Sequence, residues 1–196
     1  MAQAMLENKK TSVQLAGELW QEVRSSWCML MVPVTLLCSS LETEKFIWAW
    51  LLAALLVLLA LGDYRYGLLY DSLVLAVLVA GIGPLYTGLV SVPEALAGSL
   101  AGGGLFYLLR VLSRGGLGLG DVKLLAALGP WLGWQGMIIC LLLSSSLGLC
   151  YGSYLLLQGK ITRQSALPFG PWLAAGALVA FAWGDAGWAY LEAWLW

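Results

Sequence analysis

Long apolar runs without charge recur along this chain, and they constrain its fold more than any other feature. A helix needs about 20 apolar residues to cross the roughly 30 Å hydrocarbon core of a bilayer. Six uncharged intervals come close to this length or exceed it: residues 27–41, 46–62, 72–93, 95–109, 124–159 and 164–184. Hydrophobic residues make up 61% of the sequence and charged residues 11%, under half the usual share of about 25%. We therefore expect an all-α, polytopic integral membrane helical bundle.

The fifth interval, residues 124–159, is too long for one span. At 1.5 Å per residue it would form a rod of about 54 Å. Because glycines and a proline just before Trp134 offer a place to turn, we divide the interval there. A short helix from about Asp121 and a full span from about Met137 to Leu157 result. This gives seven membrane segments, and since the first and fifth are short, six true spans remain an alternative.

The basic residues predict the orientation, because short cytoplasmic loops collect lysine and arginine. With the N-terminus inside, Lys45 falls on the outer side and every other basic residue falls on the cytoplasmic side. These others are Lys9, Lys10, Arg24, Arg65, Arg110, Arg114, Lys123, Lys160 and Arg163. We therefore predict a cytoplasmic N-terminus.

The first 26 residues differ from the rest of the chain. Thr11 and Gln14 form a capping-box pattern, and apolar residues from Val13 to Trp27 recur at helical spacing on one face. A cleavable signal peptide would instead carry an apolar core after its lysines. We predict that residues 1–26 form a cytoplasmic, interfacial amphipathic segment and that residues 27–196 form one membrane-embedded domain.

Composition excludes several kinds of site. The sequence has no histidine, so it has no Ser-His triad, Cys-His dyad or histidine-ligated zinc. Its four cysteines lie in apolar runs and never as Cys-x-x-Cys, so they are interpreted as small hydrophobic residues. A net charge of −1 gives no indication of nucleic-acid binding. We expect no metal and no cofactor.

Three acidic residues lie at the predicted inner ends of membrane helices: Asp63, Asp71 and Asp121. Placing a carboxylate near hydrocarbon costs several kcal/mol unless it is paired. Insertion scales give about 3 kcal/mol for an acidic residue at the centre of a membrane helix. Asp63 ends one span and Asp121 begins another, so the two can meet at one depth. Structural explanations stay open. Asp121 can be a helix N-cap after a glycine-rich loop, Asp63 and Asp71 can be solvated loop charges, and Lys123 can be an interfacial anchor.

Three motifs occur in order along the chain. They are Gly-Leu-Gly-Asp-Val-Lys at 118–123, an aspartate pair eight positions apart at Asp63 and Asp71, and Pro-Phe-Gly-Pro at 168–171. This set resembles the type IV prepilin peptidase family, the GxGD-type intramembrane aspartic peptidases, over roughly residues 46–182. The proline that usually precedes the second acid of the pair is Tyr70 in this sequence.

The resemblance implies roles for individual residues. Asp63 and Asp121 would be the catalytic pair. Asp71 would be supportive, because the family has Asp or Asn there and an amide is no general base. Gly118, Gly120 and Lys123 would support the site.

The resemblance also implies a substrate and a place. The substrate would be a type IV prepilin or a type II secretion pseudopilin, cut in the bacterial inner membrane after a short basic leader that precedes a hydrophobic helix. Larger members of the family carry Cys-x-x-Cys pairs linked to N-methylation. This sequence has none, so we expect a peptidase without methyltransferase activity.

Two carboxylates that share one proton can hydrolyse a peptide, one as base toward water and the other as acid. A presenilin-like or signal-peptide-peptidase-like protease is an alternative, suggested by Tyr70 with Asp71 and by the motif at Asp121; it would pair Asp71 with Asp121. A transporter or assembly scaffold that uses the acids as an ion relay is a non-enzymatic alternative.

Overall fold

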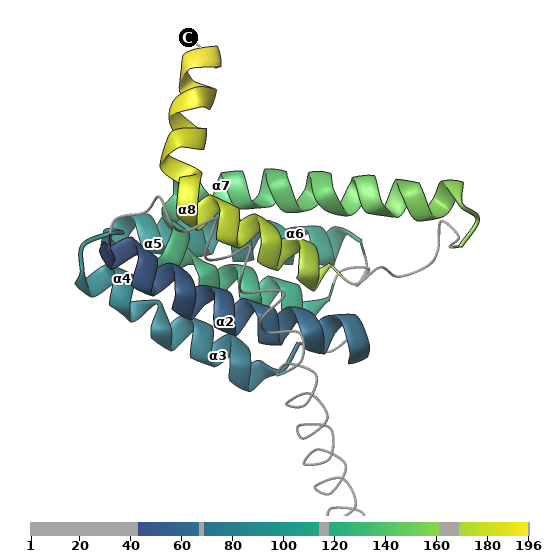
Figure 1. The fold of residues 1–196 in the computed structure, drawn as a ribbon, viewed down its shortest axis with the longest axis horizontal. Coiled ribbons are helices and arrows are strands. Elements are labelled where there is room, and N and C mark those ends of the chain that lie inside the picture. The colour runs from purple at the N-terminus through teal and green to yellow at the C-terminus, as the bar shows by residue number, and fades with distance from the viewer. Residues whose placement is uncertain (1–42, 67–68, 114–117, 161–168, 196) are drawn as a thin grey trace, which may run out of the picture. The chain divides into compact units, whose positions relative to one another are not determined.

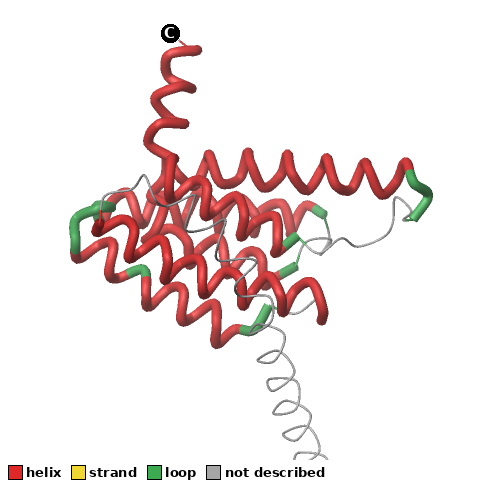
Figure 2. Tube along the Cα trace, viewed as in Figure 1, coloured by secondary structure: helices red, strands yellow, loops and turns green. Residues whose placement is uncertain are grey.

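The computed structural model describes residues 43–66, 69–113, 118–160 and 169–195. The predicted interfacial segment 1–26 and the predicted span 27–41 lie outside these residues. Every regular element in the described part is a helix, drawn in red in Figure 2. The prediction of an all-α fold is confirmed for this part of the chain.

The elements follow one another from α2 at Thr43 to α8 at Leu195 (Figure 1). Their bounds are α2 Thr43–Tyr66, α3 Asp71–Ala80, α4 Ile82–Tyr86, α5 Val92–Ser99, the π-helical η1 Leu100–Gly104, α6 Leu105–Leu112, α7 Leu119–Leu157 and α8 Gly170–Leu195. In the described residues, three helical stretches are long and apolar enough to cross a membrane: Glu44–Asp63, Val92–Leu112 and Leu119–Leu157. The count of six or seven spans and the orientation stay predictions.

The long helix α7 breaks where the sequence predicts a division. Gly133 has φ 61° and ψ −170°, which ends the first half of the helix one residue before Trp134. Glycine adopts this left-handed φ at little cost because it has no Cβ. The kink gives α7 two halves that run in different directions, so the first half can pack inside the bundle (Figure 1). The expected division of interval 124–159 is confirmed.

Within the uncharged interval 72–93, α3 and α4 form one apolar helical stretch over Asp71–Tyr86, and the chain then leaves the helix. The interval contains α3, α4, a turn and the first residues of α5. The turn ends at a capping box, in which the Ser91 backbone N–H donates to Glu94 Oε2 at 2.9 Å and the Glu94 N–H donates to Ser91 Oγ at 3.4 Å. Counting charges missed this helix start, although Ser-x-x-Glu marks it in the sequence.

The last helix also differs from its predicted interval, residues 164–184. It begins at Gly170, with Pro171 in its first turn, where a missing N–H costs nothing. It continues to Leu195 through a break at Trp183, whose φ is −131°. Beyond Trp183 the helix turns away from the bundle, as the yellow end in Figure 1 shows.

The first half of α7 lies at the centre of the core. α7 packs against α8, α5, η1 and α3. Fully buried leucines come from all sides of the contact, including Leu56 on α2, Leu128 on α7 and Leu173 on α8. The buried Trp131 donates its indole N–H to the Val77 carbonyl at 2.9 Å and so fixes α3 against α7. The packing thus joins α7 to α8 and α3, and α2 to α8 and α3.

Candidate active site

Asp63 lies near the end of α2 and is buried, with 8% of its surface exposed. It shares a helix face with the buried Leu56 and Leu59, so the packing of α2 fixes the position of its carboxylate. Its Oδ2 accepts a hydrogen bond of 2.8 Å from the backbone N–H of Gly170, the first residue of α8. A charged group at this depth is costly unless it is paired or used.

Gly170 allows this contact because it lacks a side chain. A Cβ added at Gly170 would lie 2.6 Å from Asp63 Oδ2 and 2.9 Å from Asp63 Cβ. Any larger residue would therefore collide with the Asp63 side chain and displace it. The sequence shows Gly170 within the Pro-Phe-Gly-Pro motif, but sequence reasoning gave it no role, since the bond to Asp63 joins positions 107 apart.

Asp121 lies in the first turn of α7 and is partly buried. The helix begins at Leu119 and its N-cap is Gly118, so Asp121 is the third helical residue and not the N-cap. A Cβ added at Gly118 would lie 3.0 Å from Asp121 Oδ2. The carboxylate is therefore close to the start of the helix, where the positive end of the helix dipole favours a negative charge.

Gly120 lets another part of the chain pass close to Asp121. A Cβ added there would lie 2.7 Å from the Cβ of Leu69, which is two residues before α3. The glycines at 118 and 120 thus keep the surroundings of Asp121 tight, because one faces its carboxylate and the other faces the segment that leads into α3. The supporting role of both glycines stays a prediction.

The carboxylates of Asp63 and Asp121 are near enough to interact electrostatically. They come from α2 and α7, 58 positions apart in the sequence. Two carboxyl groups that interact in a partly dry site repel each other when both are charged, so they tend to share one proton. This arrangement can act as an acid and a base at the same time.

Asp71 has a different partner. It is the first residue of α3, and both of its carboxylate oxygens accept from Lys123 Nζ, at 2.8 and 2.9 Å. The pair is exposed, with 72% of the Asp71 side chain and 50% of the Lys123 side chain open. The structure therefore places Asp71 in an ion pair that joins α3 to α7. Sequence reasoning missed this pairing, because nothing local connects the two positions.

Among the described residues, no group of three or more His, Cys, Asp or Glu side chains is arranged to hold a metal ion. The cysteines of the described part are both free: Cys140 is buried and Cys150 is exposed.

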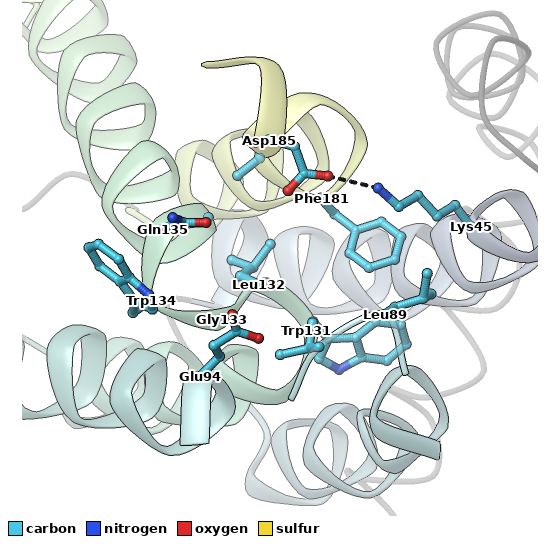
Figure 3. A pocket seen from close by; sticks show the side chains of 14 residues that line it. Lys45, Leu89, Glu94, Trp131, Leu132, Gly133, Trp134, Gln135, Phe181 and Asp185 are labelled. Atoms are coloured by element: carbon cyan, nitrogen blue, oxygen red, sulfur yellow. Dashed lines mark hydrogen bonds and ion pairs between the residues drawn. The ribbon is translucent and has the colours of Figure 1, made fainter. Parts of the chain in front are cut away.

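A second cluster of charges lies at the opposite end of α2 and the first half of α7 (Figure 3). It lines a small cavity of about 100 Å³ together with the kink at Gly133. Lys45 Nζ pairs with Asp185 Oδ2 at 2.8 Å, and Glu94 takes part in the capping box of α5. Lys45, the one basic residue predicted on the outer side, lines this cavity together with Glu94 and Asp185.

The chain is similar to a known protein family and to several of its members. A model of the type IV leader peptidase family matches residues 50–153, a range that contains Asp63, Asp71 and Asp121. The chain is 42% identical over 143 residues to a prepilin leader peptidase/N-methyltransferase of Aeromonas hydrophila. This alignment covers 70% of this chain and 49% of the relative.

Proteins of the same name from Pseudomonas putida and Pseudomonas aeruginosa are also similar. The first is 40% identical, over 66% of this chain and 47% of the relative, and the second is 36% identical, over 80% and 58%. The chain spans about half the length of these curated relatives. No solved structure gives a significant match.

Proposed function

Because the chain belongs to the type IV leader peptidase family, we propose that it is a membrane-embedded aspartic endopeptidase. It removes the short basic leader from type IV prepilins or type II secretion pseudopilins at the cytoplasmic face. The observation that carries the aspartic mechanism is the placement of Asp63: it is buried at the end of α2 with its Oδ2 2.8 Å from the Gly170 N–H, and its carboxylate is within electrostatic range of Asp121 in the first turn of α7. A buried acid close to a second acid does not stabilise the fold. A chemical role therefore explains why both are present.

In the proposed reaction, one carboxylate of the pair takes a proton from water while the water oxygen attacks the scissile carbonyl carbon. The other, protonated carboxyl group donates its proton to the carbonyl oxygen. When the tetrahedral intermediate collapses, the C–N bond breaks, the first carboxyl group gives the proton it took from water to the leaving amine, and the second carboxylate takes back a hydroxyl proton of the intermediate. The Gly170 N–H orients Asp63 through its hydrogen bond of 2.8 Å. Asp71 and Lys123 support the site by joining α3 to α7.

We propose that the protein is a multi-pass protein of the bacterial inner membrane with a cytoplasmic N-terminus. Three described helical stretches are apolar and long enough to span, and the basic residues of the sequence favour this orientation. The aspartates then lie at the inner leaflet, where water and a basic leader are both available. The bilayer and the precursor are the proposed partners.

The names of the relatives carry a second activity, N-methyltransferase. We propose the peptidase activity for this chain, because the range that matches the leader peptidase family contains Asp63, Asp71 and Asp121. Membership of a peptidase family also makes a transporter or scaffold a poorer explanation of the acids. The ion pair of Asp71 with Lys123 favours Asp63 over Asp71 as the partner of Asp121, in contrast to the presenilin-like alternative.

The test is cleavage of a co-expressed precursor, followed by its mobility on a gel. We expect the Asp63→Asn and Asp121→Asn variants to leave the precursor uncut while their level in the membrane fraction is unchanged. The Asp71→Asn variant should retain cleavage. Full activity of both the Asp63 and the Asp121 variants would contradict the aspartic mechanism, and no cleavage by the unaltered protein would contradict the peptidase assignment.

A further inference from the structure

An apolar groove of about 590 Å³ runs along the outside of α3, α5 and α7, beside the candidate active site. One wall is formed by Leu75 and Leu78 of α3, and the floor includes Ala126 and Ala127 of α7. Both leucines stay exposed, at 58% and 42% of their surface, although they belong to a concave surface. We call this feature the α3/α5/α7 groove.

The groove exists because two helices pack on α7 and hardly touch each other. The Trp131 N–H holds α3 through the Val77 carbonyl, and the Ser99 hydroxyl holds α5 by donating to the Ala126 carbonyl at 2.9 Å. Between these two attachments the surface of α7 carries alanines, whose side chains are too short to fill the space. Small residues on its floor permit a close approach by another helix.

The groove begins at the depth of the candidate active site. Its polar end is the Asp71–Lys123 ion pair. Lys123 follows Asp121 by two residues, which is about 3 Å along the axis of α7. From Asp71 to Leu78 the wall then extends for about 10 Å, or two helical turns. A helix lying in the groove would therefore present its inner end at the level of Asp121.

We propose that the α3/α5/α7 groove receives the apolar transmembrane helix of the uncleaved precursor; this inference rests on the proposed function. The apolar wall and small floor suit a helix that is already in the membrane. The charges at the inner end suit the leader, because an exposed ion pair contributes only about 0–1 kcal/mol. A basic residue of the leader can thus share the exposed Asp71 carboxylate with Lys123 at little cost.

A photocrosslinking experiment tests the location. A benzophenone amino acid replaces Leu78 in the groove or, as the control, Leu149 on the second half of α7, which is 71% exposed and outside the groove. Both versions also carry Asp121→Asn, so that a co-expressed precursor stays uncut. We expect a crosslink to the precursor helix from position 78 and none from position 149. Crosslinks from position 78 to lipid alone, or to a second copy of the protein, would overturn the proposal.

A kinetic experiment tests the consequence in the active protein. The Leu78→Trp variant narrows the groove, and we expect its KM for the full precursor to rise about tenfold with kcat little changed. A Leu149→Trp variant serves as the control and should behave as the unaltered protein. A soluble peptide that contains the leader and the cleavage site but lacks the helix should be cut equally by all three proteins.

The peptide separates the two possible failures. If the unaltered protein cuts neither precursor nor peptide, the proposed function fails. If it cuts both and Leu78→Trp leaves the KM for the full precursor unchanged, the proposed function stands and the groove proposal fails. If Leu78→Trp lowers cleavage of the peptide as much as that of the precursor, the substitution acts on the active site and the groove proposal is again wrong.

Discussion

The two ends of the bundle both carry aspartate, lysine and glycine, but they hold their carboxylates differently. At the end shown in Figure 3, Asp185 is paired with Lys45 and 84% of its side chain is exposed, and Glu94 belongs to a capping box. At the other end, Asp63 is 8% exposed, accepts a backbone N–H and interacts with a second acid. The first set of charges is solvated and satisfied, whereas the second is buried beside a like charge.

This difference separates charges that stabilise the fold from charges that lower its stability. An exposed ion pair or a cap stabilises a protein by about 1 kcal/mol or less, and nothing further is needed to explain it. A buried carboxylate beside another one lowers stability, so its presence indicates a function. Neither the size of a cavity nor the number of charges makes this distinction, since the charged cavity of Figure 3 lies at the end without buried acid.

The largest expected difference in cleavage rate between the two ends follows from removing one carboxylate at each end. We expect Asp63→Asn to lower the cleavage rate at least about 100-fold, because a group that moves a proton in the transition state is removed. The matched variant Asp185→Asn should keep its rate within about twofold, since it alters an exposed pair. Cleavage of a precursor by purified protein measures both. Equal losses in the two variants would mean that the ends do not differ in function.

The second effect concerns the backbone N–H that Asp63 accepts. A methyl group at Gly170 would collide with Asp63, at 2.6 Å from Oδ2. We expect Gly170→Ala to lower kcat about tenfold or more by displacing the carboxylate, as small misplacements at an active site do. Gly187→Ala is the control on the same helix, because a Cβ there would meet Ile139 at an ordinary 3.5 Å. An unchanged kcat in the Gly170 variant would show that the hydrogen bond does not position Asp63.

The third effect should appear in stability and not in cleavage. Gly133 has φ 61° and ψ −170°, a conformation that costs a residue with a side chain about 1–3 kcal/mol. We therefore expect Gly133→Ala to lower the unfolding temperature in detergent while precursor cleavage persists, since the kink lies at the end away from Asp63. Gly104→Ala is the control, because no atom lies within 4 Å of a Cβ added there, and it should leave stability equal or slightly higher. A loss of cleavage at unchanged stability would place the kink in the active machinery.

The sequence predicted the break in α7 because the break has a local mark: Gly133 follows a proline and another glycine. The pairing of Asp63 with Asp121 stays a prediction, which rests on Asp63 ending one apolar run and Asp121 beginning another at the same predicted depth. The helix start at Ser91 is also marked in the sequence, by Ser-x-x-Glu. The absence of charge over residues 72–93, however, does not show where the preceding helix ends. The Gly170 bond to Asp63 and the pairing of Asp71 with Lys123 had no local mark, since both depend on tertiary packing.

The smallest effect comes from the two exposed lysine–aspartate pairs, which are alike in geometry and differ in place. Lys45 and Lys123 each lie 2.8 Å from an aspartate oxygen. We expect Lys45→Met and Lys123→Met each to lower the free energy of unfolding by about 1 kcal/mol or less. Only Lys123→Met should change cleavage, by a few fold, because its partner Asp71 begins the helix that lies beside Asp121. Thermal unfolding and cleavage rates measured on both variants decide this. If Lys45→Met changes cleavage as much as Lys123→Met, then a surface ion pair affects the reaction through the stability of the whole bundle and not through its nearness to the two acids.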